Sequence, residues 1–198
     1  MTPWGTIEAL DGRGDLTGNR GGRLHDDAGD LVRAHTGRAW ITCLLEFKDR
    51  RKPVMGRGTY SSLFFLDEAA AMAAGHRPCF ECRRPAAEAF VAAWKVGQPT
   101  DSLAEIDRTL HAERLAGRWP RQRKLTSEAN LASLPNGAYV ALGDEAWLVL
   151  DGHLLGWSPA GYERRRQRPT GDVTVLTPPS TVRAISDGYH PTIHASAV

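Results

Sequence analysis

The chain has few cysteines and no long apolar run, and both shortages exclude whole classes of protein. Its 198 residues include only three cysteines, Cys43, Cys79 and Cys82, too few for the disulfide framework of a small secreted protein. No apolar run approaches the ~18 residues that a membrane-spanning helix needs. The first residues also lack the charged and apolar regions of a signal peptide. We therefore expect a cytoplasmic protein without a membrane partner.

Positive and negative charges nearly balance. The formal net charge is +2, too small to predict a nucleic-acid partner by itself, so any basic surface must be local. Twenty glycines and twelve prolines predict many turns and short elements rather than a helical bundle.

The pattern of apolar residues predicts an α+β protein. Residues 39–47 and 59–66 are typical of strands because they are β-branched and aromatic. Helices are predicted behind the N-cap Asp67 as far as Gly75, from about Pro85 to Lys95, and within 101–117. Residues 138–158 predict a three-strand meander, residues 171–177 a fourth strand, and the stretch from Ser180 to Gly188 a short final helix.

This pattern divides the chain into two predicted units. Residues 1–125 would form a first domain with a helical extension. Residues 126–198 would form a small antiparallel β subdomain, either an open sheet or a partly open barrel.

Cys79 and Cys82 form a Cys-x-x-Cys pair, which is a moderate metal-binding signal. Cysteines at this spacing in a tight turn can both point at one ion, with backbone N–H groups supporting the thiolates. Basic residues flank the pair and favour thiolate over thiol: Arg77, Arg83 and Arg84. Zinc usually takes four ligands, so further ligands must come from elsewhere in the chain.

The stretch from Phe65 to Arg83 resembles the metal-binding domain of the Ada DNA-repair protein. That family has a phenylalanine, a short alanine-rich helix ending in Ala-Gly, an aromatic residue, and then Arg-Pro-Cys-x-x-Cys. The matching positions here are Phe65, Glu68, Ala69, Ala74, Gly75, Arg77, Pro78, Cys79, Cys82 and Arg83, with His76 in place of the aromatic residue. The resemblance covers about residues 40–84 and does not extend to the last hundred residues.

The resemblance implies that residues 1–125 form an Ada-like zinc-binding domain with its helical extension, and that the zinc site includes Cys43. In that family four cysteines hold zinc, one of the upstream pair accepts a methyl group from a DNA phosphotriester, and nearby arginines contact the phosphate backbone. Cys79 and Cys82 match the downstream pair, and Cys43 falls where the upstream pair should be. The second upstream cysteine is missing, because Phe47 stands four residues after Cys43. The fourth ligand could be His76, His25, His111 or a water molecule.

The resemblance also gives the basic residues near the cysteines a role in binding nucleic acid, with DNA as the expected form. The expected contacts to phosphate are Arg50, Arg51, Lys52, Arg57, Arg77, Arg83 and Arg84. Arginine suits this task because its planar guanidinium binds phosphate through two hydrogen bonds. Other basic clusters lie at 118–124 and 164–168; ordinary solvated loops would explain any one of these clusters equally well.

Two other functions are compatible with the same residues. His111 and Glu113 form a His-x-Glu pair that, with Pro78-Cys79-x-x-Cys82, matches the zinc deaminase signature in reversed order. In such a hydrolase His111 would be a metal ligand and Glu113 the catalytic proton shuttle, beside an open metal position. Alternatively, zinc would have only a structural role and would stabilise a small interaction domain. Two interpretations of the cysteines need no metal: three buried thiols, or a redox disulfide between Cys79 and Cys82.

Overall fold

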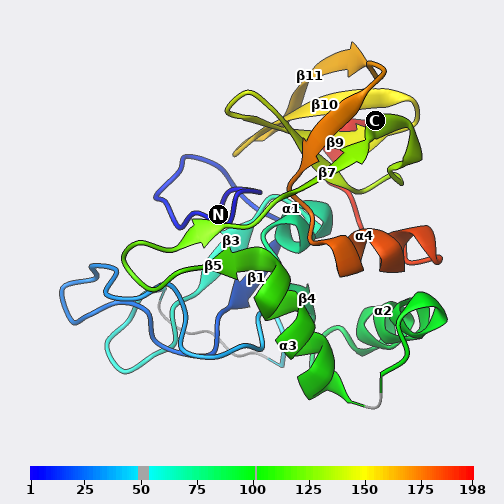
Figure 1. Ribbon diagram of the computed structural model, residues 1–198. Helices are drawn as coiled ribbons and strands as arrows, with labels where there is room; N and C mark the ends of the chain where they lie inside the picture. The colour runs from blue at the N-terminus through cyan, green and yellow to red at the C-terminus, as the bar shows by residue number, and fades with distance from the viewer. Residues whose placement is uncertain (49–53, 101) are drawn as a thin grey trace.

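The structure is a computed structural model, and it describes residues 1–48, 54–100 and 102–198. Within these residues there are a four-stranded sheet, a six-stranded sheet and a two-stranded ribbon, with four α-helices around and between them (Figure 1). The predicted α+β class is confirmed.

The four-stranded sheet comes from the N-terminal half of the chain, and its strand order is β3-β1-β2-β4. The strands are β1 (Leu16–Asn19), β2 (Ile41–Leu44), β3 (Leu63–Phe65) and β4 (Arg77–Pro78). Strand β1 is antiparallel to both β2 and β3, whereas β4 runs parallel to β2. The parallel pair matters for the site because it joins segments far apart in the sequence.

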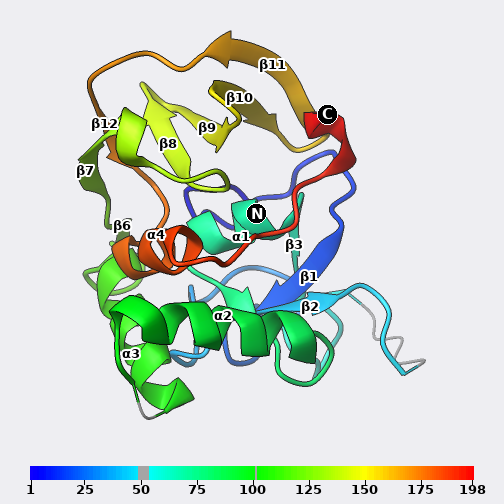
Figure 2. The same cartoon turned by 90° about the vertical axis from the view of Figure 1, so that its right-hand side faces the viewer.

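Helix α1 (Glu68–Ala73) is short, and all six of its residues are buried. Asp67 caps it by accepting a hydrogen bond from the Ala70 N–H at 2.8 Å, and the chain leaves it through Gly75 at φ +86°. Ala69, Ala70 and Ala73 face the six-stranded sheet, Ala71 packs with Leu63 and Phe65 of β3, and Met72 contacts the helical layer. Figure 2 shows α1 between the six-stranded sheet above and α2 below. Small side chains allow this close approach on every side.

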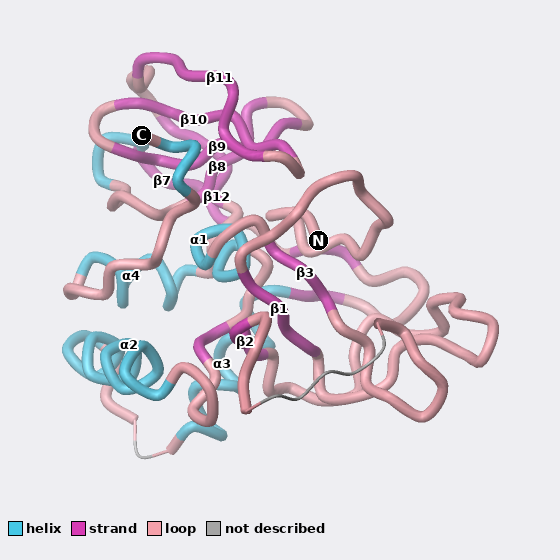
Figure 3. The backbone as a smooth tube through the Cα atoms, turned by 180° about the vertical axis from the view of Figure 1, so that it is seen from behind, coloured by secondary structure: helices cyan, strands magenta, loops and turns pink. Residues whose placement is uncertain are grey.

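Three further helices form a common core below α1. They are α2 (Arg84–Gly97), α3 (Leu103–Arg114) and α4 (Pro179–Ser186). Their buried cluster includes Phe90, Trp94, Leu110, Ile185 and Tyr189. Figure 3 shows α4 beside α2 although it follows the second sheet in the sequence. The two halves of the chain therefore share a core, and the division near residue 126 stays a prediction.

The six-stranded sheet is antiparallel, with the strand order β11-β10-β9-β8-β12-β7. Its strands are β7 (Ser127–Asn130), β8 (Tyr139–Leu142), β9 (Glu145–Leu150), β10 (His153–Ser158), β11 (Gly161–Gln167) and β12 (Asp172–Val175). The predicted antiparallel C-terminal sheet is confirmed. The ribbon of β5 (Leu115–Ala116) and β6 (Arg123–Lys124) joins α3 to this sheet, and the short helices η1 (Leu131–Ser133) and η2 (Ala195–Ala197) complete the chain.

Strand β11 contains Arg164, Arg165 and Arg166, which the sequence analysis left outside the predicted strands. It pairs with β10 along its whole length, and the guanidiniums of Arg164 and Arg166 lie 4.9 and 5.8 Å from the ring centroid of Trp147. Pairing and cation–π contacts thus stabilise a strand that its composition does not indicate.

Across the three ranges that the structure covers, no helix combines the length and apolarity needed to cross a membrane.

Candidate metal centre

The parallel pairing of β2 and β4 brings the three cysteines together. Ile41 lies opposite Arg77 and Thr42 opposite Pro78, and the Cys79 N–H donates to the Thr42 carbonyl at 3.0 Å. Cys43 and Cys79 are the next residues in these two segments, so they are neighbours. The sulfur atoms of Cys43, Cys79 and Cys82 all lie within 4.8 Å of one another. Three thiols so arranged can hold a metal ion.

The turn from Cys79 to Cys82 supports sulfur ligands through its backbone. The Glu81 N–H donates to Cys79 Sγ at 3.3 Å. Burial works to raise the pKa of the Cys79 thiol, but the N–H groups of Cys82 and Glu81 outweigh it, so this pKa lies below its ordinary value. The Arg83 N–H then donates to the Cys79 carbonyl at 3.0 Å as the chain enters α2. The thiolate of Cys79 is therefore stabilised before any metal binds.

The other two thiols are less inclined to ionise by themselves. Burial, followed by the proximity of Cys79 and Cys82, raises the pKa of Cys43. Burial also raises the pKa of Cys82, although a hydrogen bond from the Leu44 N–H opposes it. Three thiolates at this separation repel one another strongly unless a cation lies between them. The donor set thus fits a soft or borderline divalent metal, and zinc binds thiolate sulfur at about 2.3 Å.

The alternation of side chains places Cys43 on the open side of the four-stranded sheet. Thr17 lies directly opposite both Cys43 and Phe64, so these three side chains share one face, which we call the outer face. Leu63 and Phe65 point the other way and are buried. Thr17 and Phe64 also line a cavity of about 1250 Å³. The cysteine cluster therefore lies beside a large groove.

The three candidate histidine ligands lie outside the cysteine cluster. His76 is buried, with its ring 4.7 Å from that of Phe65, and its Nε2 accepts a hydrogen bond from Arg20 Nε at 3.4 Å. His25 Nδ1 is 2.5 Å from Ser61 Oγ. His111 Nδ1 accepts from Arg114 Nη2 at 3.0 Å. Within the residues that the structure describes, the metal-binding group consists of the three cysteines alone.

Glu113, the predicted proton shuttle, contacts the first turn of α4. Its carboxylate accepts from the Ser180 N–H at 3.0 Å and from the Ser180 hydroxyl at 2.6 Å. It lies outside the cysteine cluster and supplies the negative charge that a helix N-terminus favours.

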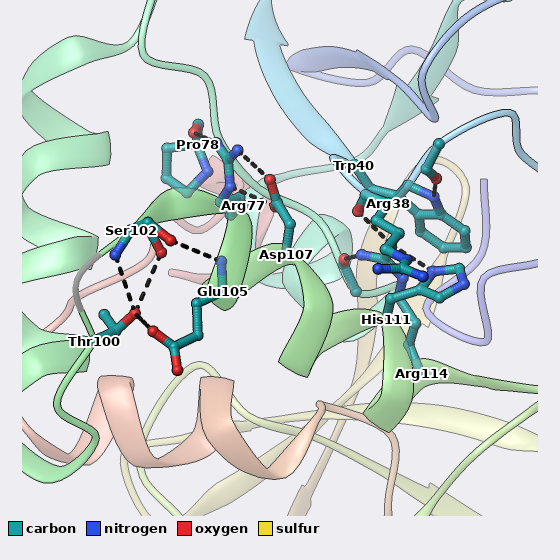
Figure 4. A network of polar contacts seen from close by, with 12 residues as sticks. Arg38, Trp40, Arg77, Pro78, Thr100, Ser102, Glu105, Asp107, His111 and Arg114 are labelled. Carbon is teal, nitrogen blue, oxygen red and sulfur yellow. Dashed lines mark hydrogen bonds and ion pairs between the residues drawn. The ribbon is translucent and has the colours of Figure 1, made fainter.

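Two of the arginines predicted to contact phosphate are engaged inside the protein. Arg77 forms a two-point ion pair with Asp107, with both contacts at 2.8 Å (Figure 4), and the two side chains are only 7% and 10% exposed. Arg83 is 2.9 Å from a carboxylate oxygen of Glu68 and donates to Thr42 Oγ1, also at 2.9 Å. These pairs fix β4 and the start of α2 against the rest of the fold.

The other predicted contacts differ in exposure. The side chain of Arg57 is 85% exposed, 3.5 Å from Asp27, and that of Arg84 is 65% exposed, 3.6 Å from Glu88. Arg50, Arg51 and Lys52 lie outside the described residues. Their contact with nucleic acid stays a prediction.

The sequence patterns did not indicate the cluster of cations around Trp40, at the start of β2. The guanidinium carbons of Arg20 and Arg114 lie 3.8 and 3.7 Å from its ring centroid, so they must occupy opposite faces of the ring. Burial lowers the pKa of His76, and Arg20 and Arg114 add to this effect, so the imidazole is neutral and accepts from Arg20. No pattern in the glycine-rich segment around Arg20 could have predicted this.

Arg114 links the cluster to the turn before the cysteines. It donates to the carbonyls of Gly75 at 2.7 Å and Arg38 at 2.6 Å (Figure 4 shows the side near Arg38 and His111). Burial lowers its pKa to about 9, with Asp107 opposing and Arg77 adding to the shift. The segment leading to Cys43 and the segment leading to Cys79 are thus held by the same side chain.

We compared the chain with protein-family models, curated proteins and solved structures. None matched. The proposal of function therefore rests on the geometry of the site and on the sequence motif that contains Cys79 and Cys82.

Proposed function

We propose that the protein binds zinc through Cys43, Cys79 and Cys82, and that this centre acts at the phosphate backbone of nucleic acid, with DNA as the expected substrate. The observation that carries the metal proposal is the grouping of the three sulfurs within 4.8 Å. Thiolates select zinc over the hard cations magnesium and calcium. Three protein ligands also resemble a zinc site that keeps one position for water or substrate.

The proposal for nucleic acid depends on the Ada-like motif and on the location of Cys43. This thiol lies on the outer face and is half-buried there. Zinc, when bound, supplies the charge that keeps the thiols deprotonated. The sulfur of Cys43 would attack the methyl carbon of a methylated phosphotriester. The S–C bond forms as the C–O bond breaks, and the phosphodiester leaves with the electron pair.

The contacts of Glu113 give no support to the hydrolase alternative. Its carboxylate is used by the N-H and hydroxyl of Ser180. A purely structural zinc is supported by the way the cysteines join β2 to the start of α2, and the experiments below separate it from a reactive centre.

Metal analysis of the purified protein tests the first half of the proposal. We expect about one zinc ion per chain, lost in Cys79→Ser and in Cys43→Ser and retained in the control His111→Gln. A wild-type protein without zinc, or with zinc unaffected by both cysteine variants, would contradict the proposal.

DNA binding and methyl transfer test the second half. Binding to duplex DNA should weaken steeply as salt rises and should weaken further in Arg50→Ala with Arg51→Ala, while the exposed Arg108 on α3 serves as the control in Arg108→Ala. After exposure to methylated DNA, Cys43 should gain the mass of one methyl group. If zinc is present but neither DNA binding nor methylation occurs, the metal is structural.

A further inference from the structure

The groove beside the cysteine cluster is lined by aromatic side chains. Its volume is about 1250 Å³, and Phe47, Tyr60, Phe64 and Trp157 are among the residues that line it. We call it the aromatic groove. Its lining residues come from β1 and β3, from the segments on either side of residues 49–53, and from the N-terminal segment.

Exposed apolar surface is concentrated in this groove. Nine large hydrophobic side chains are exposed among the described residues, and four of them line it: Leu10, Leu45, Val54 and Phe64. Phe64 is 40% exposed although it lies in the middle of β3. Apolar surface gathered in one concave place marks a binding site more often than scattered exposure does.

The groove lies next to the candidate metal centre, although none of the three cysteines lines it. Thr17 of β1 lines it and pairs directly with Cys43 in the neighbouring strand β2. Phe64 lies opposite Thr17 in β3, the strand on the other edge of β1. A ligand stacked on Phe64 would therefore lie two strands away from the Cys43 sulfur, about 10 Å at the usual strand spacing. This separation is comparable to the width of a nucleotide.

The charges in the groove favour uncharged rings over phosphates. Glu8, Asp30 and Glu46 line it together with Arg13, Lys48 and the N-terminal residue Met1, so the groove has no excess of positive charge. A phosphate would gain no net attraction inside, whereas a nucleobase is uncharged and aromatic and needs none. Carboxylates can also accept hydrogen bonds from the amino groups of bases, as they do with cytosine N4.

We propose that the aromatic groove binds the unpaired bases of single-stranded nucleic acid while the phosphates remain outside it. This inference rests on the proposed function and names the form of nucleic acid that the site takes. Base stacking on aromatic side chains tolerates sequence because every base has a π face. Unpaired bases are needed because a duplex keeps its bases stacked on one another.

The test compares three probes with the full-length protein: a single-stranded oligonucleotide of about 15 nucleotides, the same strand in a duplex, and the same strand with abasic sites. We expect the single strand to bind at least tenfold more tightly than either of the other two. Phe64→Ala should weaken single-strand binding by about five- to 150-fold, the loss of one stacked base. The matched control is Val96→Ala on α2, since Val96 is 70% exposed and does not line the groove.

Each other outcome overturns the inference in a distinguishable way. Equal binding of all three probes refutes the groove as a base site but leaves the backbone contact of the proposed function intact. No binding of any probe refutes both. A change in oligomeric state in Phe64→Ala without a change in affinity would assign the groove to a second copy of the chain, and binding of an apolar dye that nucleic acid cannot displace would assign it to a small organic ligand. Denaturation of Phe64→Ala identical to the wild type excludes misfolding as the cause of any loss.

Discussion

The ion pair between Arg77 and Asp107 offers the sharpest test of how the fold positions the cysteines. Arg77 is in β4, two residues before Cys79, and it binds Asp107 of α3 through two hydrogen bonds of 2.8 Å. It also donates to the carbonyl of Pro78 at 3.2 Å. Asp107→Asn keeps the shape of the side chain but removes its negative charge, which leaves a buried guanidinium without a counter-ion.

The expected loss of stability can be worked out from the burial of the pair. The two side chains are 7% and 10% exposed, so solvent cannot compensate the charge of Arg77. Removing one partner of a buried pair costs about 3–5 kcal/mol. At about 2–4 °C per kcal/mol for a chain of this size, the melting temperature should fall by about 6–20 °C. Replacing both residues together, as Arg77→Met with Asp107→Leu, should recover much of this loss.

Urea denaturation and thermal unfolding measure this effect, with an exposed ion pair as the matched control. Arg84 and Glu88 are 3.6 Å apart with side chains 65% and 59% exposed, so Glu88→Gln should change stability by less than about 0.5 kcal/mol. Competition with a chelator should also show weaker zinc binding in Asp107→Asn, because Cys79 directly follows β4. A loss below about 1 kcal/mol in Asp107→Asn would refute the reasoning that this pair holds β4 in place.

Three further substitutions test other contacts that stabilise the fold around the cysteines. Burial lowers the pKa of Lys124 to about 7, with Arg114 adding to the shift. Because the unfolded chain keeps this proton to about pH 10, the free energy of unfolding should rise between pH 7 and 10 by up to about 1.4 kcal/mol per pH unit. Urea titrations of Lys124→Met should show a smaller rise than those of the wild type. Glu113→Gln should destabilise the protein by about 0.5–2 kcal/mol through the lost charged contact with Ser180 without reducing the zinc content, whereas a hydrolase would lose turnover and keep its stability. Gly75→Ala should lower the free energy of unfolding by at least about 1–2 kcal/mol because of its positive φ alone. Displacement of Arg114 should lower it further, because the Arg114 Cδ would lie 2.5 Å from the new Cβ. An unchanged denaturation curve would contradict this argument.

The sequence predicts the parts of this fold that local chemistry controls. Asp67 as an N-cap, Gly75 as the residue that ends α1, and the alternating strands after residue 138 all follow from short-range rules, and the structure contains them. The grouping of Cys43 with Cys79 and Cys82 came from the family resemblance instead. Local patterns could not supply it, because it depends on a parallel pairing of β2 with β4 across about 36 residues.

The contacts of charged side chains could not be predicted, because they depend on partners far away in the sequence. His76 stands next to the cysteine motif, yet Trp40, Phe65 and Arg20 surround it. Glu113 resembles a catalytic residue in sequence but contacts Ser180, 67 residues later. A residue's position in a motif predicts its chemistry only when the fold leaves its polar atoms without internal partners.

The arginines beside the cysteines show why this distinction matters for function. In the sequence, Arg77 and Arg83 suggest a basic surface around the metal, but their partners Asp107 and Glu68 neutralise them inside the protein. They brace the segments that carry Cys79 and Cys82, so their removal should reduce metal binding and stability before it affects any polyanion. Salt-dependent binding of nucleic acid, if present, must then arise from exposed groups such as Arg57 and from the basic stretch of residues 50–52. Arg57→Ala should therefore lower the affinity for DNA with the zinc content unchanged, whereas Arg83→Ala should lower the zinc content; the opposite pattern would reverse the roles that burial assigns to these two residues.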